Sequence, residues 1–134
     1  VMVGFPGEGE PEFLDTLNLI RDLPMTYLHV FPFSKRDGTA AVKIKRHCTD
    51  VIKKERSQQL IELGKQKRRQ FNSRYIGGVI NPLVEDHENF TSKLFTGVTD
   101  NYVKAVFPGP APVGKIVSVK VEKIRDDVVY GTMI

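Results

Sequence analysis

The sequence changes its pattern of apolar residues at Gly77-Gly78, and this change limits the folds that the chain can adopt. Before the two glycines, apolar residues form short continuous runs or recur at helical spacing. After them, short strand-like runs alternate with turn signals. A chain of 134 residues has room for two small pieces. We therefore expect an α/β part followed by an all-β part.

The first part has the pattern of a parallel βαβ unit. Residues 1–5 and 27–33 are apolar runs typical of buried strands. Between them, Pro11 suits the first turn of a helix, and Pro24 ends that helix. A polar loop, residues 34–41, follows the second strand. Strand, helix and strand with short connections form a parallel unit. The apolar stripe of the helix consists of Phe13, Leu14, Leu17, Ile20 and Leu23.

One βαβ unit is too small to form a closed α/β domain. Its first strand lacks a neighbour on its N-terminal side, and its sheet needs more helices than this chain supplies. We therefore expect the C-terminal piece of a larger enzyme. A small domain of unusual architecture is the alternative.

A long helix is predicted from Thr49 or Asp50 to about Arg74. Its apolar stripe is thin and is interrupted by Arg56 and Lys67, so we expect the helix to lie across a surface. Residues 43–75 carry eleven basic and three acidic side chains, net +8, whereas the segments on either side are slightly negative. Such a block attracts polyanions in a salt-sensitive way. Charge alone favours the simpler alternative, a solvated helix face. The stripe consists of Ile52, Leu60, Leu63, Phe71 and Tyr75.

The second part is predicted to be a small closed barrel of OB-like type with five short strands. Turn signals at residues 86–89, 108–110 and 126–127 separate the strands. Pro82 cannot donate to a sheet ladder, so the first strand is expected to be bulged or at an edge there. Valines alternate along the fourth strand until Lys123 breaks the pattern. The five strands are expected at residues 78–85, 92–99, 101–107, 115–124 and 128–134.

The single cysteine, Cys48, excludes an internal disulfide and a cysteine-only metal or iron–sulfur site within this chain. A reducing cytoplasm is the simplest setting, and no apolar run approaches the length of a membrane span. We predict no catalytic residue and no metal ligand. The His47-Cys48 pair lacks metal-ligand spacing, His29 is expected in the core, and the remaining carboxylate pairs lie in turns.

Several stretches in order resemble the radical S-adenosylmethionine methylthiotransferases: GFPGE, YLHVFPFSKRDGTAA, IKKER, LVE and GVTDNYV. The resemblance covers essentially the whole chain. It implies that residues 1–48 end a radical-SAM barrel of TIM-like type, that residues 49–75 are a linker helix, and that residues 76–134 are an RNA-binding TRAM barrel. The TDNY sequence is most similar to the branch that adds a methylthio group at C2 of threonylcarbamoyladenosine 37 in tRNA.

The sequence departs from the family pattern at several positions. Gly9 stands where the family usually has threonine, and residues 47–49 read HCT in place of QVP. The cysteines for the iron–sulfur clusters are absent, so this chain alone should be inactive. S-adenosylmethionine and two four-iron–four-sulfur clusters are expected in the complete enzyme, and none of them bound to this chain.

The resemblance also suggests site residues. Gly4, Phe5, Pro6 and Gly7 would lie near S-adenosylmethionine, and the alternative is a plain strand-to-helix turn. Ser34, Arg36 and Thr39 follow the second strand, where they would meet a polar substrate. For an anticodon stem-loop we favour cations, amides and an aromatic ring. These residues are Lys65, Lys67, Arg68, Arg69, Arg74, Lys93, Thr99, Asn101, Tyr102 and Lys104.

Two other functions stay open from the sequence. The first keeps the family but replaces tRNA with a ribosomal-protein aspartate, and the TDNY sequence argues against it. The second is a freestanding RNA-binding module without catalysis. Self-association through the exposed half-barrel is a further expectation.

Overall fold

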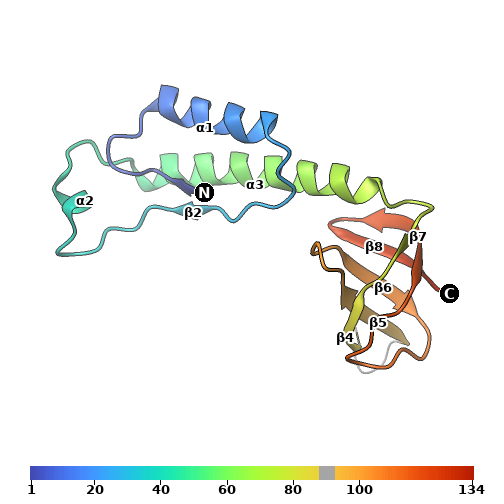
Figure 1. Ribbon diagram of the computed structural model, residues 1–134. Coiled ribbons are helices and arrows are strands. Elements are labelled where there is room, and N and C mark those ends of the chain that lie inside the picture. Colours follow the sequence, from blue (N-terminus) through green and yellow to red (C-terminus); the bar gives the residue numbers. More distant parts are fainter. Residues whose placement is uncertain (88–92) are drawn as a thin grey trace. The chain divides into compact units, whose positions relative to one another are not determined.

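The computed structural model describes residues 1–87 and 93–134. The contacts divide it into two compact units, Val1–Lys67 and Arg68–Ile134. The boundary falls inside the long helix α3 (Asp50–Ser73), so the last turns of α3 belong to the second unit. The predicted turn at 86–89 lies partly outside the described residues. Figure 1 shows the elements in sequence colours.

The first unit contains the predicted parallel βαβ arrangement. Strand β1 (Met2–Val3) pairs in parallel with β2 (Phe31–Pro32), and helix α1 (Glu10–Asp22) connects them. Both strands are shorter than predicted, because the parallel register joins only Met2 with Phe31 and Val3 with Pro32. The N–H groups of Phe31 and Phe33 donate to the carbonyls of Val1 and Val3 at the two ends of this short pairing. The loop predicted after the second strand contains a four-residue helix, α2 (Ala40–Lys43).

A small apolar core holds the first unit together. Val3, Phe13, Ile20 and Leu60 are buried in it, so β1, α1 and α3 share one core. The prediction for α1 is wrong at Leu14 and Leu23, which are exposed. The predicted start of α3 is confirmed, because the Thr49 hydroxyl accepts a hydrogen bond from the Ile52 N–H at 3.3 Å.

The second unit is a curled six-stranded sheet that fits a small β-barrel. The strand order is β3-β7-β8-β6-β5-β4, and the sheet is mixed because β6 and β8 are parallel. β3 and β4 are consecutive in the chain but lie at opposite ends of this order, which requires the sheet to curl. The strands are β3 (Val79–Ile80), β4 (Leu83–His87), β5 (Leu94–Val98), β6 (Lys104–Pro108), β7 (Val119–Arg125) and β8 (Val128–Met133).

Pro82 explains why there are six strands where five were predicted. The predicted first strand is broken at Asn81-Pro82 into β3, which pairs with β7, and β4, which pairs with β5. Proline has no N–H for the ladder, so the break falls there. The other edge of β4 is partly covered, because the Val84 N–H donates to the Lys115 carbonyl at 2.8 Å.

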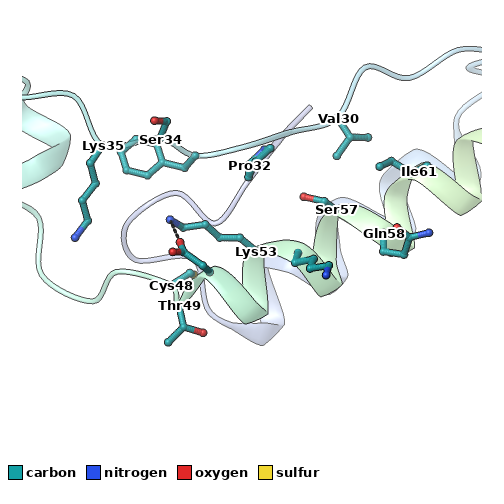
Figure 2. Close-up of a pocket in the computed structure, with 13 residues that line it drawn as sticks. Val30, Pro32, Ser34, Lys35, Cys48, Thr49, Lys53, Ser57, Gln58 and Ile61 are labelled. Carbon is teal, nitrogen blue, oxygen red and sulfur yellow. Dashed lines mark hydrogen bonds and ion pairs between the residues drawn. The ribbon is translucent and has the colours of Figure 1, made fainter.

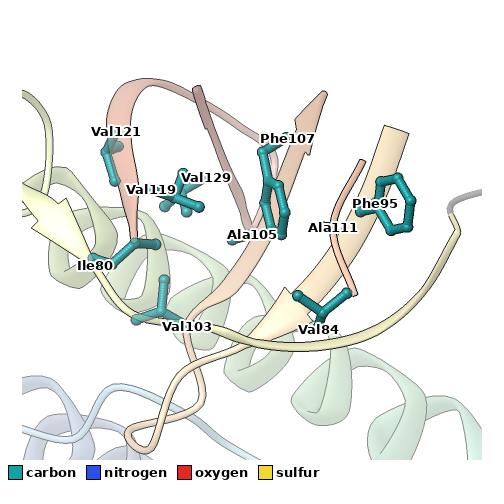
Figure 3. Close-up of a cluster of buried hydrophobic side chains, with 10 residues drawn as sticks. All are labelled: Ile80, Val84, Phe95, Val103, Ala105, Phe107, Ala111, Val119, Val121 and Val129. Carbon is teal, nitrogen blue, oxygen red and sulfur yellow. The ribbon is translucent and has the colours of Figure 1, made fainter. Parts of the chain in front are cut away.

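The barrel core is built from one face of each strand, as Figure 3 shows for ten buried side chains. Val119 and Val121 are fully buried, as their alternation predicts. The β7–β8 pairing shifts register between Val121 and Lys123, at the residue where the sequence pattern breaks. Among the described residues, none of the helices combines the length and apolar character that crossing a bilayer requires.

Candidate nucleic-acid interface

The turn between β5 and β6 is held in one conformation by Thr99. The Thr99 N–H donates to the Val103 carbonyl at 3.1 Å, and the Thr99 carbonyl accepts from the Tyr102 N–H at 2.9 Å. The Thr99 hydroxyl accepts from the Val103 N–H at 2.9 Å. Thr99 is buried, so its hydroxyl serves the turn itself.

Asn101 braces the same turn. Its side-chain oxygen accepts a hydrogen bond from the Thr99 hydroxyl at 2.6 Å, and its amide nitrogen donates to the Tyr75 hydroxyl oxygen at 2.7 Å. Since a carboxamide nitrogen has two hydrogens, one donor of Asn101 remains for a ligand. Sequence reasoning found Asn101 but not its link to Tyr75.

Tyr102 presents its ring to solvent from a fixed backbone. The residue is 75% exposed and has a φ of 63°, a left-handed conformation that non-glycine residues adopt rarely. Its carbonyl accepts a hydrogen bond from the buried Arg68 guanidinium. A strained backbone with an exposed aromatic ring is a reason to look for function.

A groove runs beside this turn on the barrel, with a volume of about 640 Å³. We call it the barrel groove. Its wall combines exposed apolar side chains, carboxamides and carboxylates. It is lined by Tyr75, Val79, Ile80, Asn81, Leu83, Glu85, Val98, Thr99, Asp100, Asn101, Tyr102 and Ile116.

The predicted cations differ in what their side chains contact. The Lys67 ammonium donates to the Arg21 carbonyl at 2.8 Å and the Leu23 carbonyl at 2.7 Å, which satisfies the C-terminal end of α1. Arg68 is buried beneath Tyr102. The Arg74 guanidinium lies over the Phe71 ring, 5.9 Å from its centroid. Lys65 and Arg69 are exposed.

Lys93 and Lys104 lie on neighbouring strands, but at opposite ends of the β5–β6 ladder. Leu94, next to Lys93, pairs with Pro108, whereas Lys104 pairs with Val98. Lys104 therefore lies near the Thr99–Tyr102 turn, and Lys93 lies at the far end of these two strands. Both side chains are exposed.

The Gly4–Gly7 turn is held by hydrogen bonds within the first unit. The Gly4 N–H donates to Glu8 Oε1 at 3.0 Å, and the Gly7 N–H donates to the Arg46 carbonyl at 2.9 Å. Phe5 is 44% exposed, and its ring meets the Phe33 ring edge-on at 5.3 Å. Pro6 is buried. The N–H groups of both glycines are thus engaged within the protein, and Phe5 presents an exposed aromatic ring.

Arg56 lies beside the Gly4–Gly7 turn, and sequence reasoning did not identify its partners. Its guanidinium bonds Glu8 Oε1 at 2.6 Å and Glu10 Oε2 at 3.3 Å, and it lies 5.1 Å from the centroid of the Phe13 ring. It also donates to the Glu8 carbonyl at 3.1 Å. The signal in the sequence was a charged residue that interrupts an apolar helix stripe.

Of the three predicted substrate residues, Ser34 lines a cavity of about 910 Å³ between the β2 segment and the start of α3. Figure 2 shows Ser34 and Lys35 on one side of it and Lys53 on the other. Arg36 and Thr39 are exposed and do not line it. The Thr39 hydroxyl donates to the Arg36 carbonyl at 2.8 Å, so Thr39 closes a local turn.

His29 was expected in the core, and this prediction is wrong. The residue is exposed, and its ring lies 4.7 Å from the Tyr27 ring and 6.1 Å from the Phe31 ring. These three residues alternate along the chain and project from the face that the core does not use.

Residues 73–134 match the model of the TRAM domain. Over 126 residues the chain is 42% identical to the threonylcarbamoyladenosine tRNA methylthiotransferase of Bacillus subtilis, covering 92% of this chain and 28% of that protein. The chain is a homologue of the tRNA methylthiotransferases, and residues 73–134 are its TRAM domain.

Two further methylthiotransferase relatives extend the comparison. The threonylcarbamoyladenosine enzyme of Aquifex aeolicus is 36% identical over 89% of this chain and 27% of its own length. The tRNA-2-methylthio-N(6)-dimethylallyladenosine synthase of Acetivibrio thermocellus is 33% identical over 100% of this chain and 28% of its own. The chain thus spans little more than a quarter of these relatives.

The residues present fit S-adenosylmethionine only as a contact surface. The N–H groups of Gly4 and Gly7 are already engaged, and the exposed ring of Phe5 is the side-chain surface that this turn could present to such a cofactor. Four-iron clusters do not fit. Within the described ranges, no group of three His, Cys, Asp or Glu side chains could hold a metal ion.

Proposed function

We propose that this chain is the tRNA-docking part of a methylthiotransferase that adds a methylthio group at C2 of threonylcarbamoyladenosine 37. The observation that carries the proposal is a TRAM domain within a chain that matches tRNA methylthiotransferases along nearly its whole length. In this proposal, residues 1–48 complete the radical-SAM barrel, residues 49–75 link it to the TRAM domain, and residues 76–134 meet the anticodon stem-loop in the cytoplasm.

The cofactors belong to the complete protein. Bound S-adenosylmethionine and two iron–sulfur clusters would supply the radical and sulfur chemistry. This chain would contribute the Phe5 ring to the S-adenosylmethionine site and Ser34, with Arg36 and Thr39 nearby in sequence, to the substrate side. The cysteines that ligate the clusters must come from residues outside this chain, because Cys48 is its single cysteine.

The relative that favours the threonylcarbamoyladenosine branch is the Bacillus subtilis enzyme, at 42% identity. The Aquifex aeolicus enzyme, at 36%, is level with the dimethylallyladenosine synthases, which reach 35%. We expect a strain that lacks the gene to lose the methylthio group on threonylcarbamoyladenosine and to keep it on dimethylallyladenosine. Mass spectrometry of tRNA nucleosides measures both. Loss from the second nucleoside alone would identify the other branch, and unchanged tRNA would favour a ribosomal-protein substrate.

RNA binding by this chain should depend on salt. We expect the affinity for an anticodon stem-loop to fall as salt rises, because lysines and arginines that meet phosphates release counterions. The double variant Lys65→Gln/Arg74→Gln should lower the slope of log affinity against log salt by about 1.5, since each phosphate contact contributes roughly 0.7 to 0.9. Fluorescence anisotropy across a salt series measures the slope.

The control is Lys43→Gln/Lys45→Gln, which removes the same charge from exposed positions elsewhere in the basic segment. Equal slopes for the two double variants would exclude a specific role for residues 65–74. No binding at low salt would exclude tRNA docking by this chain. Self-association through the half-barrel stays a prediction, and sedimentation of the same preparation tests it.

A further inference from the structure

We propose that the barrel groove binds one unpaired nucleobase, stacked on the ring of Tyr102. The inference rests on the proposed RNA-binding function and adds to it the place and the mode of contact. It assigns contact roles to Val79, Leu83 and Ile116, which the sequence analysis did not select.

Four exposed apolar or aromatic side chains are concentrated in the groove. Tyr102, Val79, Leu83 and Ile116 are 75%, 52%, 45% and 69% exposed, and all four line this one groove. An antiparallel bridge between Leu83 and Ile116 fixes two of them side by side. Apolar side chains that gather around an aromatic ring mark a binding surface.

The charges of the groove favour a base over a phosphate. Its lining includes the carboxylates of Glu85 and Asp100 and the carboxamides of Asn81 and Asn101, and no lysine or arginine among the residues described. Carboxylates repel phosphates but accept hydrogen bonds from the amino and imino groups of bases. Lys104, next to the turn, is placed to meet the neighbouring phosphate. The groove therefore suits a base whose phosphate lies outside it.

The base must be unpaired, because a paired base in an RNA helix stacks on its neighbours and shows little of its face. The backbone of Tyr102 is already held in place for stacking with such a base. Its carbonyl is held by Arg68, and its N–H donates to the Thr99 carbonyl, so binding orders little more than the ring itself. Stacking of this kind tolerates different bases, and it makes the site a reader of single-stranded loops.

The test compares two RNAs of equal length, an anticodon stem-loop and a fully paired duplex, by fluorescence anisotropy with the whole chain. Tyr102→Ala should weaken binding of the stem-loop about 5- to 100-fold, which is the range of one stacked base. Binding of the duplex and the salt slope should not change. Tyr102→Phe keeps the ring and should bind the stem-loop as the unchanged chain does.

Two further measurements keep the test decisive. Tyr102→Ala keeps a Cβ, so the left-handed backbone at this position is no more strained than in the unchanged chain. If this variant nevertheless fails to fold, Ile116→Ser tests the groove at an exposed residue of its opposite wall. A 2-aminopurine placed in the loop should be quenched on binding to the unchanged chain and less so in either variant. Normal quenching in both variants would overturn the base site.

The outcomes separate this inference from the function on which it rests. If Tyr102→Ala binds the stem-loop normally while Lys65→Gln/Arg74→Gln weakens binding, tRNA docking stands and the nucleobase site is wrong. If the unchanged chain binds neither RNA at low salt, the proposed function fails and the nucleobase site fails with it.

Discussion

Replacing Arg56 by methionine is expected to destabilise the first unit by about 3 kcal/mol, because removal of one partner leaves a largely buried charge uncompensated. The Glu8 side chain is 14% exposed and depends on Arg56 Nη1 at 2.6 Å. Methionine fills most of the space over Phe13 but provides neither the charge nor the hydrogen bonds.

The protonation of Arg56 supports this expectation. Burial by itself lowers the pKa of its guanidinium, but hydrogen bonds and charges from Glu8 and Glu10 outweigh burial and raise that pKa above its ordinary value. Arg56 is therefore charged at every working pH. Its contribution to stability is fully present below the unfolded-state pKa of arginine, so stability near neutral pH should not depend on the titration of Arg56.

Hydrogen exchange followed by mass spectrometry measures the effect locally. Peptides from α1 should exchange faster by roughly 100-fold, which corresponds to about 3 kcal/mol, while peptides from β7 and β8 serve as the internal reference. Lys54→Met, an exposed change on the same helix, is the matched control. Adding Glu8→Gln to Arg56→Met should restore part of the loss, and strictly additive effects would contradict the ion pair.

The Arg56 network shows what sequence reasoning reaches and where it ends. Helical spacing predicted the helix and the interruption of its stripe by Arg56, and the capping residues predicted a start at Thr49 or Asp50. The partners Glu8 and Glu10 lie more than forty residues away, and spacing within one helix contains no information about them. The parallel βαβ order was predictable because short connections allow few alternatives, whereas the two-residue length of each strand depends on pairing across the unit.

For the candidate nucleic-acid interface, the sequence predicted which residue types are present but not what each side chain contacts. The cation count of residues 65–74 predicted a basic segment, but Lys67 and Arg68 donate to backbone carbonyls within the protein. Tyr102 was selected from the TDNY sequence, but its left-handed backbone comes from the turn. Val79 and Leu83 lie in one predicted strand that Pro82 breaks in two, and Ile116 lies far from them in the sequence; the curling of the sheet brings all three to one groove.

The largest effect on the TRAM barrel is expected from Gly131→Ala. A Cβ at this position would collide with the backbone carbonyl oxygen of Lys120 and would lie 2.8 Å from its carbonyl carbon and 2.9 Å from Val119 Cγ1. Gly131 pairs with Val121, next to the register shift in β7, so two backbones approach closely there. Neither backbone can move without breaking the ladder between β7 and β8. We expect a loss of about 3 kcal/mol or more, at the upper end for overpacking.

Thr132→Ala tests whether the effect belongs to this close approach. Thr132 is exposed on the same strand, and its hydroxyl donates only to Glu122 Oε1 at 2.6 Å, so its loss should cost about 1 kcal/mol or less.

In hydrogen exchange, Gly131→Ala should remove protection from β6, β7 and β8 and leave α1 unchanged. Because Lys104 begins β6 and Tyr102 lies just before it, this variant should also lose stem-loop binding, whereas Thr132→Ala should retain it. If the Gly131→Ala and Thr132→Ala variants protect these strands from hydrogen exchange equally well, the β7–β8 pairing has room for a side chain at position 131. That result would contradict the register described for these two strands.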